Sequence, residues 1–525
     1  MKAAFAGVLL ACLVVAVAGT WRWPLVGDAP LMHYVVFLLQ HGMAPYRGVV
    51  DINMPGAWFV EWMAMHVLGG GSLGWRIFDL LVDAGCIAAL MAIAWPYDRF
   101  AGFIAGALFV LLHIRDGIIE MGQRDLTMTL LLLTGYAILF RVLRSERPAG
   151  HAGAVALFGF CIGFAATVKP TPVVLFPPLA ALACLELRRR GERWMPFLAA
   201  ALAGFALPLL LVFGYLWHER AISAFFAIIF RLIPAHSDLH RRPLGYLIAH
   251  SFDSILLPLF FLWLPVALFG RIRRNWESAA LLLGLLFGLA SFYVQAKGYS
   301  YHRYPAEAFL LLMVCMDLCA VLRRAGSRRA LWMQGVAVVV LAVGVAVVGV
   351  GSTRKALTYH WQDREFSNLL RSDLNQLGGP GLNGKVQCLD MAAGCLDTLY
   401  RMRLVQDTGF LYDCYFLQPA KGDGGYRRRF WKAMQADPPR VFVETSHTCE
   451  QGPRNYRYSD LRDWPRFDEW IHAHYFVYAS RVPPDPLYWS GEPGPPFGYR
   501  IYVRDDQMKK LAGKLTGAEP KGSSG

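Results

Sequence analysis

Length, composition and charge place this chain in a membrane. Its 525 residues are 55% hydrophobic and 14% aromatic but only 17% charged, whereas soluble proteins carry about 25% charged residues. The formal net charge of +14 could indicate nucleic-acid binding, but the basic residues form short clusters between apolar runs and do not line one face. This distribution excludes a nucleic-acid partner and is typical of a membrane protein that follows the positive-inside rule.

Apolar windows that can cross about 30 Å of hydrocarbon predict about eleven transmembrane helices. They lie at residues 3–20, 73–94, 101–114, 125–142, 152–168, 171–187, 195–217, 250–270, 277–296, 303–322 and 330–351. A further apolar segment, Pro55 to Leu68, reaches only about 20 Å as a helix, so we expect it to be interfacial or re-entrant. The first window could be a cleaved signal peptide, since Ala16-Val17-Ala18 resembles a cleavage site, but its length favours a retained span.

The basic clusters predict the orientation of these spans. With eleven spans, four clusters fall on the same side as Lys2, which the positive-inside rule assigns to the cytoplasm. The clusters are Arg141/Arg144/Arg147, Arg188/Arg189/Arg190/Arg193, Arg271/Arg273/Arg274 and Arg323/Arg324/Arg328/Arg329. The sequence therefore predicts a multi-pass protein of the bacterial inner membrane with a cytoplasmic N-terminus. Residues 21–72, 115–125, 218–250 and 297–304, with a turn at Lys169, would lie outside.

A polar region follows the predicted transmembrane domain, which spans residues 1–351. Strand-like runs occur at 385–389, 440–444, 475–482 and 499–503, so we expect residues 352–525 to form a small α/β periplasmic domain with a frayed C-terminal tail. In an oxidising compartment, its four cysteines could form two disulfides in any of three connectivities. These cysteines are Cys388, Cys395, Cys414 and Cys449.

Two carboxylates mark the first outer segment. Asp28 follows the first span, and Asp51 lies beyond an amphipathic stretch. A carboxylate at this membrane surface can act as a general base on an acceptor hydroxyl. The alternative is structural: Asp28 would cap the helix that follows, and Asp51 would form a turn.

Charged residues recur in the later outer segments. The second segment contains Arg124 and Asp125, together with Arg115, Asp116 and Glu120, which form either a site or a set of ion pairs that anchor the spans. Arg231 belongs to an amphipathic third segment, which could be a lid or an interfacial helix. Lys169, at the outer end of a span, could face a phosphate, although snorkelling to the interface is the default expectation.

The fourth outer segment, QAKGYSYHRYP, combines the cations Lys297 and Arg303 with Tyr301 and His302. Cations bind phosphate, and tyrosines add hydroxyl donors and stacking faces. Interfacial anchoring is the alternative, but positive anchors usually lie on the cytoplasmic side. We therefore predict a phosphate-binding role.

The second predicted span carries charged residues, and the histidines are spaced without a zinc motif. Arg76, Asp79 and Asp83 share one helical face, which we interpret as an intramembrane ion pair. The histidines show no spacing such as HxxxH or HExxH, so no zinc site is predicted.

The order and sidedness of these motifs resemble the GT-C superfamily of integral-membrane glycosyltransferases, which includes protein O-mannosyltransferases and the lipid A aminoarabinose transferase. The matching features are an acidic residue that opens the first outer loop, Asp28, then the amphipathic helix 30–40, and then a "PY…D…P" stretch from Pro45 to Pro55. A second acid, Asp125, and the KGYSYHRYP segment also match. Many members carry two adjacent acids, whereas here Ala29 follows Asp28, so no cofactor is assigned and a divalent metal ion stays open.

The resemblance implies an inverting glycosyltransferase that uses a polyprenyl-phosphate-linked sugar donor. Asp28 would be the base, Asp125 would orient the acceptor or the base, and Asp51 is the third catalytic candidate. Lys297, His302 and Arg303, with Arg231, would neutralise the departing phosphate, and Tyr301, Arg124 and Lys169 are further substrate-binding candidates. Membrane lipids and an envelope glycan, glycolipid or protein acceptor are the expected partners. The rival interpretations are a non-catalytic assembly or sensor protein and a transporter.

Overall fold

A computed structural model describes residues 1–146, 151–238, 241–269, 275–323, 328–358, 365–390, 394–417, 424–446, 460–482 and 498–507. They group into two compact units, which we describe separately. Unit 1 comprises Met1–Leu25, Asn53–Tyr215 and Arg241–His360, and unit 2 comprises Val26–Ile52, Leu216–His240 and Trp361–Gly525. Unit 2 therefore contains parts of the first and third outer segments together with the C-terminal residues.

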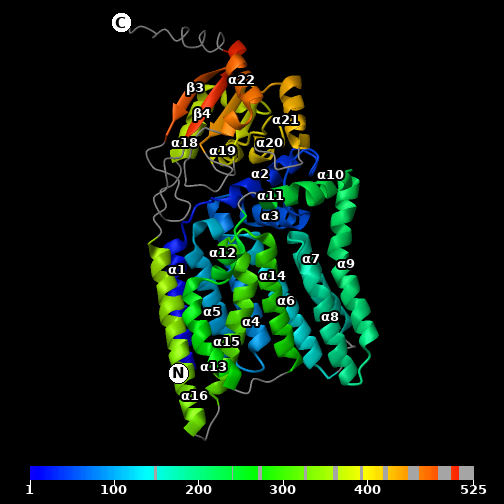
Figure 1. Ribbon diagram of the computed structural model, residues 1–525, viewed down its shortest axis with the longest axis vertical. Helices are drawn as coiled ribbons and strands as arrows, with labels where there is room; N and C mark the ends of the chain where they lie inside the picture. The colour runs from blue at the N-terminus through cyan, green and yellow to red at the C-terminus, as the bar shows by residue number, and fades with distance from the viewer. Residues whose placement is uncertain are drawn as a thin grey trace, which may run out of the picture. The chain divides into compact units, whose positions relative to one another are not determined.

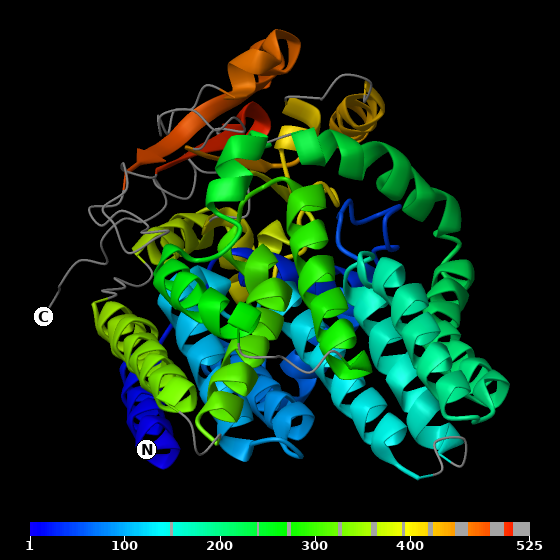
Figure 2. The ribbon, with the colours of Figure 1, turned by 60° about the horizontal axis from the view of Figure 1, so that its bottom comes forward.

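Unit 1 is helical, and its long helices run side by side (Figures 1 and 2). Its helices of more than one turn, of which α9 ends in unit 2, are α1 (Lys2–Thr20), α3 (Pro55–Leu68), α4 (Ser72–Ala94), α5 (Arg99–Asp116), α6 (Arg124–Arg144), α7 (Ala152–Val168), α8 (Pro172–Arg189), α9 (Trp194–His218), α12 (Leu244–Ala249), α13 (Leu257–Phe269), α14 (Trp276–Gln295), α15 (Tyr304–Val321), α16 (Arg328–Val343), the π-helix η6 (Gly344–Val350) and α17 (Gly351–Leu357).

Among the described residues, seven helices are long and apolar enough to cross a membrane, so the chain is a multi-pass membrane protein. They are Lys2–Thr20, Ser72–Ala94, Arg124–Arg144, Trp194–His218, Trp276–Gln295, Ser300–Val321 and Leu331–Leu357. Each of the remaining predicted windows is also helical, in α5, α7, α8 and α13, but those helices are shorter or less apolar. The count of eleven spans stays a prediction.

Small residues allow the helices of unit 1 to approach closely. A Cβ atom at Gly159 of α7 would lie 2.0 Å from the backbone oxygen of Ala201 in α9, and one at Gly204 would lie 1.9 Å from that of Ala156. Without a hydrophobic driving force between helices in lipid, such small-residue contacts supply the van der Waals packing. Larger side chains at these two glycines would force α7 and α9 apart.

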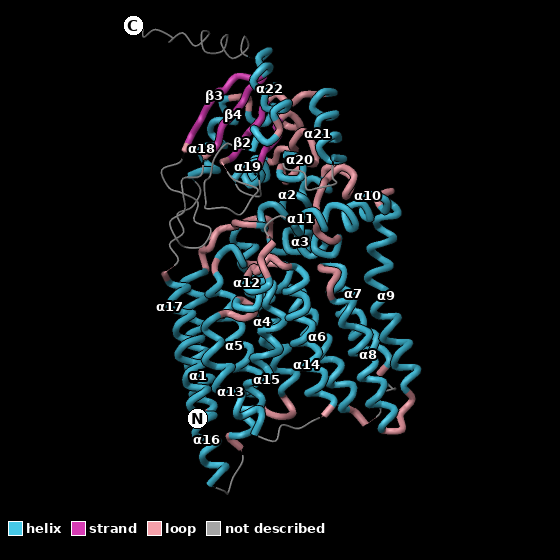
Figure 3. The backbone as a smooth tube through the Cα atoms, viewed as in Figure 1, coloured by secondary structure: helices cyan, strands magenta, loops and turns pink. Residues whose placement is uncertain are grey.

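Unit 2 contains a four-stranded mixed sheet with the strand order β1-β2-β4-β3. The strands are β1 (Val386–Leu389), β2 (Val441–Thr445), β3 (Tyr475–Arg481) and β4 (Tyr499–Arg504). Figure 3 draws the strands in magenta. β1 pairs with β2 in parallel, with Val386 opposite Val441, while β4 is antiparallel to β2 and β3. The four predicted strands are thus confirmed to within a residue or so at their ends.

Unit 2 also contains helices, of which α19 (Gly394–Met402) packs on β1 and β2, and α22 (Pro465–His474) on β3. The other helices are α2 (Asp28–Gln40), α10 (Ile222–Ala227), the π-helix η3 (Ile228–Leu232), α11 (Ile233–Asp238), α18 (Glu365–Gln376), α20 (Cys414–Leu417) and α21 (Gly424–Ala436). The Tyr34 hydroxyl of α2 donates to the carbonyl of Leu404 at 2.9 Å and accepts from the N–H of Gln406 at 2.8 Å. These bonds attach the amphipathic helix of the first outer segment to the C-terminal residues.

A disulfide joins Cys388 of β1 to Cys395 of α19. Cys414 is also disulfide-bonded, whereas Cys449 lies outside the described residues. The cysteines of the predicted spans, among them Cys86 and Cys184, are free thiols.

Candidate active site

The carboxylates of the first outer segment belong to unit 2. Helix α2 begins at Asp28, two residues earlier than predicted, and its N-cap position is occupied by Gly27 at φ 67°. The interpretation of Asp28 as the helix cap is therefore wrong. Asp51 is 5% exposed and follows Val50, which forms a parallel bridge with Phe410, so a backbone contact to the C-terminal residues determines its position.

Both carboxylates raise the pKa of one buried tyrosine of α20, Tyr415. The pKa of the Tyr415 hydroxyl is raised well above its ordinary value, first by burial and then by Tyr412, Asp51, Tyr426 and Asp28. Because Asp28 and Asp51 both contribute, the two carboxylates share the electrostatic neighbourhood of Tyr415. The Tyr415 hydroxyl is therefore protonated well above neutral pH and can donate a hydrogen bond.

His236 of α11 completes this group. Its Nδ1 lies 3.3 Å from the Tyr415 hydroxyl oxygen, and its ring meets those of Tyr412 and Tyr415 edge-on at 5.8 Å. The third outer segment therefore packs against residues after 400 within unit 2. Arg231 lies on the π-helix before α11 with an exposed side chain, so its predicted phosphate contact stays a prediction.

A second group of predicted residues meets in unit 1 around Asp125. This carboxylate is fully buried in the first turn of α6, and the Lys169 Nζ lies 2.6 Å from its Oδ2. The same ammonium donates to the Gln295 Oε1 at 2.6 Å and lies 5.6 Å from the centre of the Tyr301 ring. The default expectation that Lys169 snorkels to the interface is therefore wrong. Its ammonium instead contacts residues of α6, α14 and the fourth outer segment.

Further cations surround this pair. Lys297 and His302 are 7% and 5% exposed, and Lys169, Arg124 and Lys297 are all close enough to His302 to interact with it electrostatically. The His302 Nδ1 is buried and makes no hydrogen bond to the described residues. Three cations and the Asp125 carboxylate leave this cationic cluster with a net charge of about +2, which favours a phosphate-bearing ligand.

Arg303 pairs with carboxylates, and its predicted phosphate contact stays a prediction. Its guanidinium lies 3.5 Å from the Asp116 carboxylate and 3.5 Å from the Glu307 carboxylate. Glu307 also accepts a hydrogen bond from the backbone N–H of Asp253 at 3.0 Å. Two carboxylates therefore neutralise Arg303, so it would have to leave them to bind a phosphate. The interpretation of Arg115 and Asp116 as anchoring ion pairs is supported, because Arg115 also pairs with Asp253 at 3.3 Å.

A buried polar network in α4 and α5 holds the second outer segment. Asp79 pairs with Arg76, which confirms the predicted intramembrane ion pair, and accepts from the N–H of Gly122 at 2.7 Å. His113 bridges Asp79 at 3.0 Å and the Tyr304 hydroxyl at 2.9 Å. Sequence spacing missed His113, because it lies on a separate helix from Asp79.

This network could also be read as a metal site. Asp79, Asp83 and His113 offer ligand atoms within 4.8 Å of one another, and neither Asp83 oxygen makes a hydrogen bond to the described residues. However, both His113 nitrogens and Asp79 are already bonded within the protein, and Arg76 adds a positive charge. The donor set is thus satisfied without a cation, except at Asp83, and we assign no metal.

Comparisons with known proteins bear on the fold. No protein-family model matches the chain, and no curated protein matches it in sequence. Among solved structures, ArnT from Cupriavidus metallidurans bound to undecaprenyl phosphate is 12% identical, with a TM-score of 0.57 over 94% of this chain and 97% of that one. AglB, the archaeal oligosaccharyltransferase from Archaeoglobus fulgidus in complex with an inhibitory peptide and a dolichol-phosphate, is 11% identical, with a TM-score of 0.56 over 96% and 74%.

The apo state of the same ArnT matches equally well, with 12% identity and a TM-score of 0.56 over 96% of this chain and 98% of that one. At these identities the likeness concerns the fold. The chain therefore shares the fold of ArnT and AglB over nearly its whole length, which confirms the predicted resemblance to the GT-C proteins at the level of the fold, while the motif matches stay a prediction.

Proposed function

We propose that the protein is an inverting glycosyltransferase that moves a sugar from a polyprenyl-phosphate donor to a glycolipid, glycan or protein of the cell envelope. The observation that carries the proposal is the cationic cluster of the half-buried Arg124 and Lys169 with the buried Lys297 and His302, because it suits the phosphate that departs during transfer. The fold supports the same substrate class, since ArnT was solved with undecaprenyl phosphate and AglB with a dolichol-phosphate.

The proposed reaction is a single displacement. The acceptor oxygen forms a bond to the anomeric carbon while the bond from that carbon to the phosphate oxygen breaks, and the electron pair of that bond goes to the phosphate. The acceptor proton passes to a carboxylate, for which we propose Asp28, with Asp51 and the Tyr415 hydroxyl beside it. Attack opposite the phosphate inverts the anomeric configuration.

The departing phosphate gains negative charge, and its stabilisation is the proposed task of the cationic cluster. Lys169, Lys297 and Arg124 supply positive charge, while Tyr301 and His302 add polar contacts. Asp125 is proposed to hold the Lys169 ammonium in place through their 2.6 Å contact, so its role is positioning. Arg303 and Arg231 stay candidates for the phosphate.

We further propose the orientation that the basic clusters predict, with a cytoplasmic N-terminus, eleven spans and residues 352–525 in the periplasm of a bacterial inner membrane. The oxidised Cys388–Cys395 pair supports an oxidising compartment for these residues. A reporter fused after Arg193 should report cytoplasm, and one fused after Thr353 should report periplasm. A periplasmic signal after Arg193 would refute the orientation.

Mass spectrometry of polyprenyl lipids and envelope glycans from cells that lack the protein tests the function. We expect an accumulated polyprenyl-phosphate sugar and a glycan or lipid that lacks that sugar. The parent gene should reverse both changes, whereas Lys297→Ala should not. Arg188→Ala is the matched control, because Arg188 is an exposed cation at the end of α8. Unchanged glycans and lipids in the deletion strain would contradict the proposal.

A further inference from the structure

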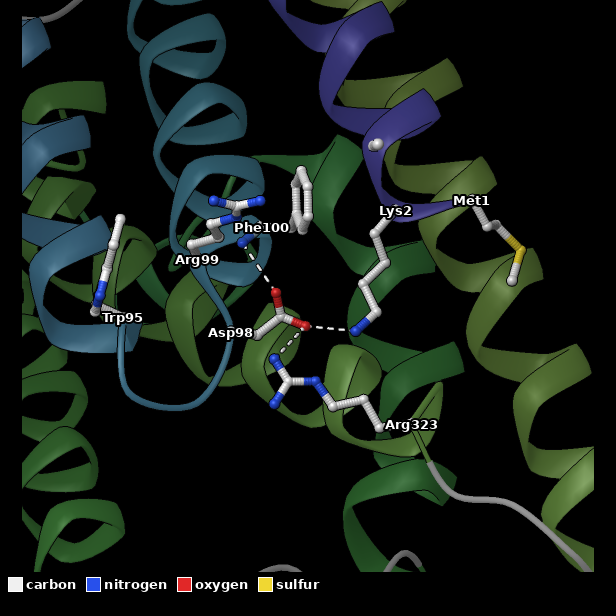
Figure 4. A pocket seen from close by; sticks show the side chains of 8 residues that line it. Met1, Lys2, Trp95, Asp98, Arg99, Phe100 and Arg323 are labelled. Atoms are coloured by element: carbon white, nitrogen blue, oxygen red, sulfur yellow. Dashed lines mark hydrogen bonds and ion pairs between the residues drawn. The ribbon is translucent and has the colours of Figure 1, made fainter.

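An open pocket of about 610 Å³ lies at the helix ends of unit 1 near the start of the chain (Figure 4). Its lining residues are Met1, Lys2, Ala3, Trp95, Asp98, Arg99, Phe100 and Arg323. They come from the start of α1, the connection from α4 to α5, the start of α5 and the residues after α15. Helix α5 runs from Arg99 to Asp116, so the pocket is roughly 26 Å along that helix from the Asp116–Arg303 pair and is separate from the candidate active site.

The pocket has more positive than negative charge. Asp98 is its one acidic lining residue, and the Asp98 Oδ2 lies 2.5 Å from the Lys2 Nζ and 2.9 Å from the Arg323 guanidinium. The other oxygen of Asp98 accepts from the N–H of Phe100 at 2.9 Å, as the N-cap of α5. Arg99 packs 5.3 Å from the centre of the Phe100 ring. Three cations against one carboxylate leave a net charge of +2.

Large apolar side chains flank these charges. Trp95, which directly follows α4, is 60% exposed, and Met1 is 66% exposed. Exposed apolar area beside cations is unfavourable in water, but it suits a ligand that has both an anionic group and hydrocarbon. A free phosphate ion would use the guanidinium groups and leave the apolar side chains in water. Basic pockets at the ends of membrane helices are typical binding sites for anionic lipid headgroups.

We propose that this pocket binds the phosphate headgroup of an anionic glycerophospholipid. The guanidinium groups of Arg99 and Arg323 donate to the phosphate oxygens in the forked geometry that arginine offers. Lys2 adds charge, and Trp95 contacts the glycerol and the first acyl carbons. Binding of such a lipid is independent of the proposed transfer reaction, because no residue of the pocket belongs to the candidate active site.

Titration of the full-length protein in detergent with phosphatidylglycerol, followed by native mass spectrometry, tests the site. Each cation near an anionic headgroup contributes about fivefold in affinity, so Arg99→Gln/Arg323→Gln should weaken binding about 25-fold. Arg188→Gln/Arg189→Gln is the matched control, because it removes two exposed cations at the end of α8, and it should change binding less than threefold. Equal loss in both pairs, or no loss in the pocket pair, would overturn the proposal.

Asp98→Asn gives a change in the opposite direction, which a folding defect cannot imitate. Asparagine caps a helix about as well as aspartate, but it removes the negative charge that competes for Lys2 and Arg323. We expect about fivefold tighter phosphatidylglycerol binding, and unchanged or weaker binding would refute the assignment. Inorganic phosphate should not displace the lipid at equal concentration; displacement would show that the pocket is a free-anion site.

Discussion

Substitutions at the Lys169–Asp125 ion pair can distinguish a structural role of Lys169 from a role in the transfer reaction. Lys169→Met keeps the length and the apolar stem of the side chain but removes the ammonium. The substitution removes the 2.6 Å ion pair of Lys169 with the fully buried Asp125 and the hydrogen bond that Lys169 donates to Gln295. Breaking a buried ion pair by removing one partner costs about 3 to 5 kcal/mol, because the other charge stays buried and unpaired.

The second substitution, Asp125→Asn, removes this unpaired charge. In the double variant Lys169→Met/Asp125→Asn, most of the lost stability should therefore return, since a pair that acts only through its mutual contact is non-additive. Thermal unfolding of the purified protein in one detergent, for the parent, both single variants and the double variant, measures this coupling. We expect the lowest midpoint for Lys169→Met alone.

Transfer activity should behave differently from stability. If the Lys169 ammonium stabilises the departing phosphate, the double variant folds but remains defective, with a loss of roughly 10²- to 10³-fold in turnover, as for other groups that stabilise developing charge. Arg190→Met serves as a control, because Arg190 pairs with Glu186 at 2.9 Å outside the candidate site. Full recovery of activity in the double variant would show that Lys169 only neutralises Asp125, and our assignment would fail.

Three further predictions concern unit 2. Asp28→Asn should insert and fold like the parent but lose about 10²- to 10⁴-fold in transfer rate, because an amide cannot accept the acceptor proton; retained activity in a transfer assay would remove Asp28 as the base. The pKa of Asp407 is raised to about 7, chiefly by burial, so its contribution to stability is full below pH 4 and falls as pH rises through 7. Asp407→Asn should flatten this decline in the unfolding midpoint, and a pH profile identical to that of the parent would contradict the assignment. Cys388→Ser removes the disulfide to Cys395, seven residues further along the chain, and should cost about 2 to 3 kcal/mol of stability. Cys184→Ser, at a free thiol, should leave the unfolding transition of unit 2 unchanged; equal midpoints for these two variants would argue against the bond.

Local patterns predicted the elements of this fold, because each pattern depends on neighbours in sequence. Every apolar window contains a helix, although α13 begins only at Leu257 in the window at residues 250–270, and the strand at residues 440–444 appears as β2 one residue later. The start of α2 was misplaced, since the preference of aspartate for capping suggested a cap at Asp28. The position is instead taken by Gly27 at φ 67°, a backbone conformation that glycine adopts at little cost.

Partners distant in sequence could not be predicted in this way. The residues of the Lys169–Asp125 pair are 44 positions apart in the chain, as the sequence numbering shows, and their contact depends on how α6 and α7 pack. Tyr415 was missed for the same reason, since its proximity to Asp28 and Asp51 requires the folding of residues from three parts of the chain into one unit. The dense aromatic and acidic run FLYDCYF at 410–416 was the available signal.

The charges within α4 bear on the transporter alternative, which would use them as an ion pathway. Arg76 donates to Asp79 and to the Thr20 hydroxyl at 2.6 Å, and Asp79 in turn holds the N–H of Gly122. A Cβ atom at Gly122 would lie 2.3 Å from the Trp75 ring, so this loop rests directly on α4. Ions that exchanged at Asp79 would break the bonds that position the segment before Asp125. These contacts favour a structural role for the α4 charges, because they position the segment before Asp125, and conduction through Asp79 would break them.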